Sequence, residues 1–110
     1  MKNLKSRYAE QRLECARTLK SILSVAIKEG WTFPEGNVKI GVNNAYREAI
    51  DSFREARLYG RALKTIDEVK QDEHTRYGPA YLKDKRSDIS TERAIAVGRY
   101  LEQRAQRTYQ

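Results

Sequence analysis

Residues 3–30 read NLKSRYAEQRLECARTLKSILSVAIKEG and carry the periodicity of one long helix. Apolar side chains recur at spacings of three, four and seven, and form a stripe of Leu4, Tyr8, Cys15, Leu19, Ile22 and Ala26. Gly30 is a natural residue to follow the helix because glycine takes a positive φ without strain. The sequence therefore predicts a helix over 3–29. Its second half, where further apolar residues widen the stripe, is expected at the centre of the core, and its charged first half toward solvent.

The next segment, residues 31–42, predicts an irregular connection, because one proline and two glycines interrupt it. Trp31 and Phe33 are expected to anchor this connection on the core, since burying large aromatic surface favours a fixed path. Val38 and Ile40 have the alternation of a short strand, and whether they form one stays open at this stage.

Two further helices are predicted around the only interruption between residues 43 and 71, which is Gly60. Asn43 or Asn44 is suited to cap the second helix by accepting a hydrogen bond from a free backbone N–H. The inward face of this helix is expected to hold Tyr46, Ala49, Ile50, Phe53 and Ala56. A third helix follows from Arg61 to about Gln71, with its inward face at Leu63, Ile66 and Val69.

The last part of the chain predicts a polar loop over 74–88, punctuated by Gly78-Pro79, and then a helix that starts at Asp88 or Ser90 and reaches about residue 108. Its expected inward face is small: Ala94, Val97, Gly98, Leu101 and Ala105. Together these segments predict an all-α fold, a compact three- or four-helix bundle with a long N-terminal helix, in a single domain over 1–110.

Charge and composition narrow the functional class. The chain of 110 residues has a formal net charge of +7, distributed as +5 over 1–28, −1 over 29–58, 0 over 59–82 and +3 over 83–110. A basic excess favours an anionic partner through steering and counterion release. No stretch approaches the roughly 20 apolar residues of a membrane span, no signal peptide is recognised, and the single cysteine agrees with a reducing compartment. The expected location is the cytoplasm.

The residues available for catalysis are few. The chain has one cysteine, Cys15, which lies on the apolar stripe, and one histidine, His74, which lies in the predicted loop. Neither belongs to a spacing typical of metal ligands, and no glycine-rich phosphate-binding motif is present. Adjacent acids such as Asp67 and Glu68 point apart on a helix and have lysines nearby. We therefore expect no enzyme, no cofactor and no metal site.

Two basic surfaces that also carry tyrosines are the candidate binding sites. At 100° per residue, one strip of the last helix gathers within about 60° the residues Arg93, Tyr100, Arg104 and Arg107. The other surface is the predicted loop, with Arg76, Tyr77, Tyr81, Lys83, Lys85 and Arg86. Arginine forks suit phosphate oxygens, and tyrosine rings stack on bases.

The same residue types are enriched at protein interfaces, so two functions stay open. The first is a non-enzymatic nucleic-acid-binding accessory or regulatory protein that contacts DNA or RNA through these surfaces. The alternative is a protein-binding inhibitor or adaptor that uses helix surfaces, with a homodimer as one form of it. A third interpretation assigns the basic surfaces no role beyond solvation.

Overall fold

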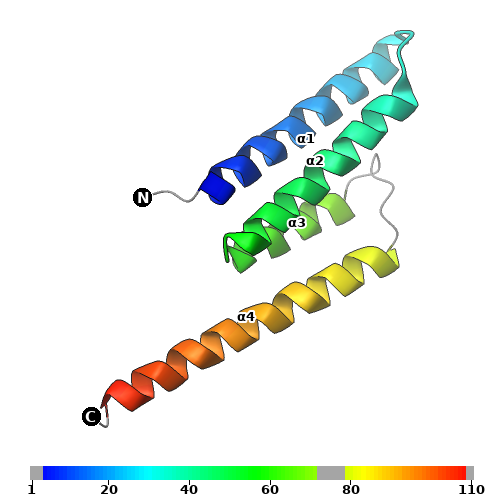
Figure 1. Cartoon of the computed structure of the whole chain (residues 1–110). Coiled ribbons are helices and arrows are strands. Elements are labelled where there is room, and N and C mark those ends of the chain that lie inside the picture. The colour runs from blue at the N-terminus through cyan, green and yellow to red at the C-terminus, as the bar shows by residue number, and fades with distance from the viewer. Residues whose placement is uncertain (1–3, 72–78, 109–110) are drawn as a thin grey trace.

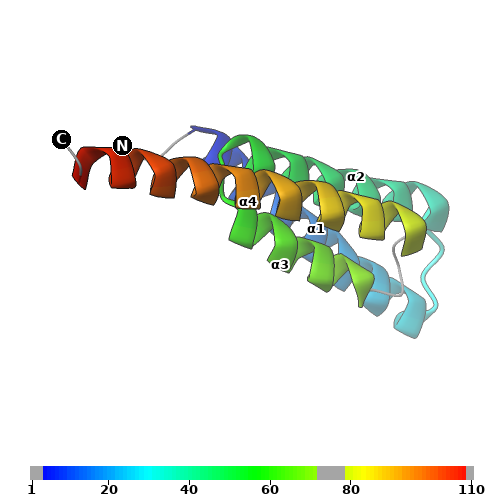
Figure 2. The same cartoon turned by 90° about the horizontal axis from the view of Figure 1, so that it is seen from below.

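The structure is a computed structural model in which residues 4–71 and 79–108 are described. It contains α1 (Leu4–Glu29), α2 (Glu35–Glu55), α3 (Tyr59–Lys70) and α4 (Pro79–Thr108). Consecutive helices run in alternating directions (Figures 1 and 2). Helices α1 and α2 form a long hairpin, and α3 and α4 pack beside it. The predicted all-α bundle is confirmed, and no strand occurs in the described ranges.

The core is centred on α2, which lies between the other helices. Its predicted inward residues Tyr46, Ala49, Ile50 and Phe53 are fully buried, as are Ile66 and Val69 of α3. The remaining helices contribute Ala9, Leu13, Ala16, Leu82 and Ile89. One polar network spans this core: the Glu68 carboxylate accepts hydrogen bonds from Arg17 Nη2 at 2.7 Å and from the Tyr46 hydroxyl at 2.9 Å. It ties α1, α2 and α3 together.

The stripe predicted for α1 is correct only in part: Ala26 is buried, and Cys15 and Leu19 pack half-buried against the core. The structure buries Ala9, Leu13 and Ala16, whereas Leu4, Tyr8 and Ile22 are exposed. The face of α1 that packs against α2 combines small alanines with Leu13 and Leu23, which are both fully buried. The second half of α1 is also not the centre of the core. Its Ile22, Val25 and Ile27 are about half exposed, because α3 and α4 cover the other end of the hairpin.

The predicted irregular connection over 31–42 is shorter than expected, because α2 begins at Glu35. Val38 and Ile40 are therefore helical, and Asn43 and Asn44 lie inside the helix instead of capping it. Gly41 lies where α2 faces α1, and a Cβ there would stand 3.4 Å from Leu19 Cδ1, which is close to ordinary van der Waals contact. The predicted anchoring by Trp31 is wrong, since its side chain is 57% exposed.

Helix α4 begins at Pro79, so much of the predicted 74–88 loop is helical, while His74, Arg76 and Tyr77 lie outside the described residues. The predicted inward face is wrong: Ala94, Val97, Gly98, Leu101 and Ala105 are all exposed. Leu82 and Ile89 are the residues that α4 buries. Helical rotation places them roughly 125° from the predicted face.

The bundle is less compact than predicted. Its dimensions are 68 × 33 × 16 Å and its radius of gyration is 17.6 Å, against about 13 Å for a compact domain of this length. The reason is visible in both views, where the C-terminal half of α4 projects past the ends of α2 and α3 (Figures 1 and 2). We call residues 93–107 the arm. Every arm residue except Ala96 is exposed.

Candidate functional site

Ion pairs within the bundle account for many of its basic side chains. They join different helices: Lys5–Glu55, Arg12–Glu48, Arg17–Glu68, Arg54–Glu92, Arg61–Glu10, Lys85–Asp51 and Arg86–Asp67. A cation that faces an acid of its own chain attracts other anions less. The positive excess of the molecule must therefore lie mainly outside these pairs.

Two of these pairs lower the pKa of their acids. Hydrogen bonds from Arg17 and Tyr46 hold the pKa of the Glu68 carboxyl below its ordinary value, against the opposing effect of burial. The hydrogen bonds from Arg54 lower the pKa of Glu92 in the same way. Both acids therefore stay ionised at neutral pH, as structural partners of arginines rather than as proton donors.

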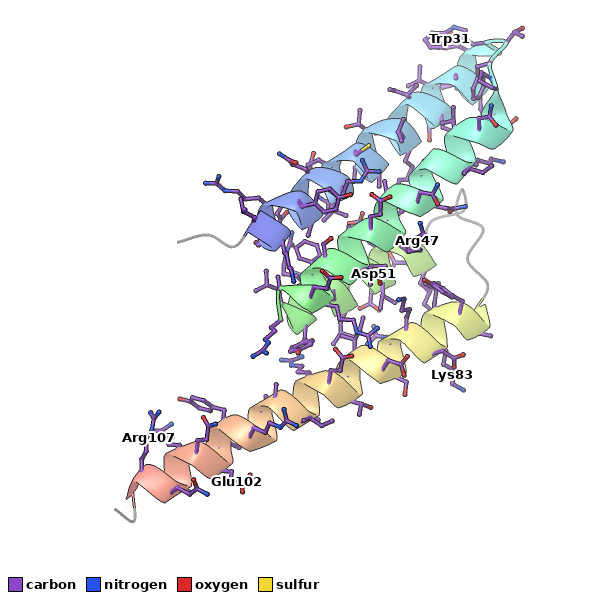
Figure 3. The ribbon with its side chains drawn as sticks, viewed as in Figure 1. Trp31, Arg47, Asp51, Lys83, Glu102 and Arg107 are labelled. Carbon is purple, nitrogen blue, oxygen red and sulfur yellow. The ribbon has the colours of Figure 1, made fainter. Side chains whose placement is uncertain are left out.

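The second predicted surface does not form the expected loop of alternating basic and aromatic residues. Tyr81, Lys83, Lys85 and Arg86 lie on the first half of α4. Lys85 donates to Asp51 of α2 at 2.7 Å and Arg86 pairs with Asp67 of α3, so these two cations attach α4 to the bundle. Lys83 points away from the bundle (Figure 3). The structure thus gives this surface a packing role at Lys85 and Arg86.

The first predicted surface, the strip of Arg93, Tyr100, Arg104 and Arg107, lies wholly on the arm and is exposed. The arm contains four arginines and one acid, Glu102, so its net charge is +3. Arg107 points to the bundle side of α4 and Glu102 to the opposite side (Figure 3). Within the described residues, neither Arg93 nor Arg107 takes part in an ion pair. The strip continues the line of the buried residues Leu82 and Ile89 along α4, so it lies on the side of α4 that faces the bundle.

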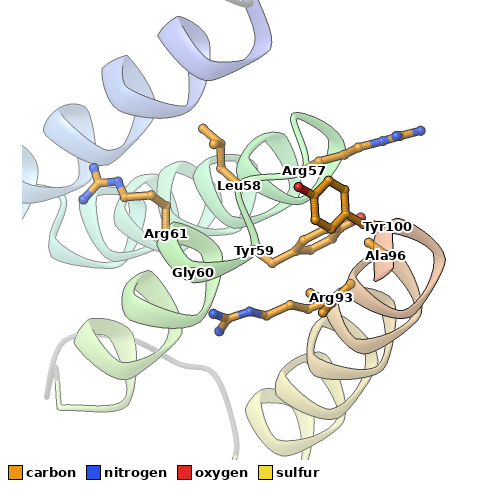
Figure 4. A pocket seen from close by; sticks show the side chains of 9 residues that line it. Arg57, Leu58, Tyr59, Gly60, Arg61, Arg93, Ala96 and Tyr100 are labelled. Atoms are coloured by element: carbon orange, nitrogen blue, oxygen red, sulfur yellow. The ribbon is translucent and has the colours of Figure 1, made fainter. Parts of the chain in front are cut away.

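A cleft joins this strip to the turn between α2 and α3. It has a volume of about 520 Å³ and is lined by residues 57–61 together with Arg93, Ala96, Val97 and Tyr100 of α4. Tyr59 and Tyr100 both point into the space between the turn and α4 (Figure 4). A neighbouring hollow of about 470 Å³ shares these two tyrosines and adds Arg99. We call the first of these hollows the tyrosine cleft.

Three arginines of the tyrosine cleft differ in what they contact. Arg61 donates to Glu10 at 2.6 Å and its guanidinium lies 5.0 Å from the centre of the Phe53 ring, so its charge is used inside the fold. Arg57 and Arg93 form no ion pair with any described residue. Their guanidinium groups lie on opposite sides of the tyrosine rings (Figure 4). The cleft therefore combines an apolar floor with two cations at its edges.

Arg57 has a backbone conformation that arginine rarely adopts. Its φ is +62°, and it follows α2 in a turn where Leu58 N–H donates to Phe53 O and Arg57 N–H donates to Arg54 O. Gly30 ends α1 in the same way, with φ +69° and the equivalent two hydrogen bonds. This turn normally uses glycine, because a side chain at positive φ is strained. One of two equivalent turns thus accepts strain and places an arginine at the tyrosine cleft.

Sequence reasoning did not find Arg57 or Tyr59. Both belong to a turn that separates two predicted helices, and their approach to α4 depends on packing of residues about forty positions apart. The sequence carries one weak signal of this turn. Gly60 lies close to it, three positions after Arg57, which is the residue that takes the positive φ.

Other chemistry finds little support. Cys15 packs against the core and is half-buried. The described part of the chain contains no group of three or more His, Cys, Asp or Glu side chains arranged to hold a metal ion. Nor does that part include a helix with the length and apolar character needed to cross a membrane.

No family model, curated protein or solved structure matches this chain.

Proposed function

We propose that this protein is a non-enzymatic nucleic-acid-binding accessory or regulatory protein of the cytoplasm, and that the arm makes its phosphate contacts. The observation that carries the proposal is the placement of charge. Three of the seven net positive charges lie on the projecting end of α4, where Arg107 points to the bundle side (Figure 3). A cationic helix whose end extends past the bundle can follow a phosphate backbone without distorting the core.

The pairing of charges in the bundle supports this choice of surface. The sequence also predicted Lys85 and Arg86 as binding residues. They form ion pairs with Asp51 and Asp67, so they are not part of the proposed interface. Arg93 and Arg107 have no acidic partner in the described residues, so a phosphate would not compete with a carboxylate of the same chain. Binding through such contacts releases counterions, and its affinity falls as salt rises.

The test compares two charge-reversal pairs. Arg104→Glu with Arg107→Glu changes the arm, and Arg47→Glu with Lys64→Glu changes exposed positions of α2 and α3 by the same total charge. Binding to a random duplex and to a single strand is measured by fluorescence anisotropy between about 50 and 200 mM salt, the range over which phosphate contacts lose affinity steeply.

The arm pair is expected to weaken binding at least tenfold and to flatten the salt dependence, while the control pair weakens it only slightly. Equal losses in both pairs would show that net charge, rather than the arm, governs binding. No binding of the unmodified protein to either nucleic acid at the lowest salt would reject the proposal.

A second function is favoured by a separate observation: an inhibitor or adaptor that binds protein, or a homodimer. The arm exposes an apolar face that includes Val97 and Leu101, each at least half exposed. The chain presents 7913 Å² of surface, about 1,600 Å² more than a compact monomer of 12.8 kDa. One partner of a standard interface buries about 800 Å². Light scattering on a sizing column tests the homodimer, and a strict monomer at high concentration would exclude it.

A further inference from the structure

The tyrosine cleft has the composition of a site for a flat, negatively charged group. Tyr59 is partly buried against the core and is therefore held in place, whereas Tyr100 is 61% exposed and reaches the cleft from the arm. Leu58, Ala96 and Val97 complete an apolar lining between the two elements. A ring that enters this space gains apolar contact on faces contributed by two separate helices.

We infer that the tyrosine cleft binds one unstacked nucleotide of a single strand, with its base against Tyr59 and Tyr100 and its phosphates at Arg57 and Arg93. This inference rests on the proposed function and names its substrate class. Bases of a duplex are stacked and paired, so they cannot offer a free face to tyrosine without the cost of extrusion. A single strand offers both a base face and a flexible phosphate backbone.

The charges around the cleft match this ligand. Arg57 and Arg93 stand on opposite sides of the tyrosine rings, so phosphates on either side of an inserted base meet a guanidinium (Figure 4). Arg61 is excluded from this role by its contacts with Glu10 and Phe53. No acid among the described residues lines the cleft itself, and Glu92, which lines the adjoining hollow, already accepts from Arg54 Nε at 2.8 Å through its Oε1. A phosphate there meets less repulsion than a free carboxylate would cause.

The strand then has a path beyond the cleft. From Tyr100 the same side of α4 carries Arg104 and Arg107 toward the end of the arm. A helix rises 1.5 Å per residue, so Arg93 to Arg107 spans about 21 Å. One strand of a duplex carries a phosphate about every 3.4 Å along its axis, so several phosphates fit this length. The cleft thus holds the base and the arm holds the backbone.

The strain at Arg57 supports a binding role independently of charge. The equivalent turn at Gly30 uses the unstrained residue, so this chain does not need arginine to make the turn. Strained residues that persist cluster at binding sites, where the side chain is required for another reason. The position of Arg57 at the edge of the cleft supplies that reason.

The experiment measures anisotropy of a labelled oligothymidylate, the same backbone with abasic sites, and a duplex of equal length. The oligothymidylate is expected to bind about five- to a hundredfold more tightly than the abasic strand, the range that base–aromatic stacking gives. Tyr100→Ala should remove most of this difference. Leu101→Ala, which changes a residue of the arm that does not line the cleft, should preserve it.

Different failures have different meanings. Equal affinity for the abasic and intact strands overturns the inference and leaves the proposed function standing. Absence of binding to every nucleic acid removes both. If free thymidine monophosphate competes as strongly as the oligonucleotide, the site takes a nucleotide rather than a strand. If poly(Glu,Tyr) binds in a Tyr100-dependent manner and the oligonucleotide does not, the ligand is an acidic protein segment and the inference is wrong.

Discussion

Replacing Arg57 with glycine is expected to make the protein more stable and a weaker binder. The left-handed conformation costs an L-amino acid about 1–2 kcal/mol, and Arg57 holds it with φ +62°. Glycine relieves this strain but raises the entropy of the unfolded chain by the equivalent of about 0.4–1 kcal/mol. The net gain is therefore about 0.5–1 kcal/mol. With an unfolding entropy of about 2.1 cal/mol/K per residue, Tm rises by about 2–4 °C.

The structure supplies the reverse substitution as a control. Gly30 takes φ +69° in the equivalent turn, and a Cβ built there meets nothing within 4 Å. Gly30→Ala therefore adds backbone strain without a steric clash and should lower Tm by about 2–4 °C. Arg57→Ala keeps the strain and removes only the guanidinium, so it should weaken oligothymidylate binding without the gain in stability.

Stability is measured by urea and thermal unfolding followed by circular dichroism, and binding by anisotropy at fixed salt. A fall in the free energy of unfolding of more than about 0.5 kcal/mol in Arg57→Gly would contradict a release of strain, because ordinary surface substitutions cost less than this. Such a loss would mean that the Arg57 side chain makes a stabilising contact. If Arg57→Gly binds the oligonucleotide as tightly as the unmodified protein, Arg57 does not contribute to binding.

Three other predictions concern the packing. Ile89→Ala should cost about 2–5 kcal/mol, measured by urea unfolding, because it empties the main buried contact of α4. Leu101→Ser should change the free energy of unfolding by less than about 0.5 kcal/mol, and a larger loss would restore the inward face predicted from the sequence. Since the folded-state pKa of Glu68 lies below its ordinary value of 4.5, its contribution is complete above the unfolded pKa and is lost as pH falls through the folded pKa. As pH is lowered, the free energy of unfolding of Glu68→Gln should therefore fall less steeply than that of the unmodified protein. An equal slope would show that other groups cause the loss of stability in acid.

Local pattern was a good guide where one helix face is strongly apolar. Phe53 and Ile66 were predicted inward and are fully buried, because they are flanked by other apolar residues at helical spacing. It was a poor guide in α1 and α4. There, α1 buries a face that combines alanines with Leu13 and Leu23, and the end of α4 extends past α2 and α3 (Figure 1). Both outcomes depend on the neighbouring helices, so neither follows from the sequence of α1 or α4 alone.

The candidate site divides in the same manner. Arg93, Tyr100, Arg104 and Arg107 share one side of a helix because the helical repeat depends only on sequence spacing. Which way that side faces depends on how Leu82 and Ile89 seat α4 on the bundle, as does the approach of the turn.

The sequence alone thus determined four helical segments, their charge and the basic strip, since these follow from local periodicity and composition. Only the tertiary structure decided that the strip overhangs a cleft, that Lys85 and Arg86 are engaged in ion pairs within the bundle, and that Arg57 and Tyr59 join Tyr100. The physical reason is that these relations are set by which faces pack and where each neighbouring helix ends, and contacts between distant residues leave no periodic signal along the chain.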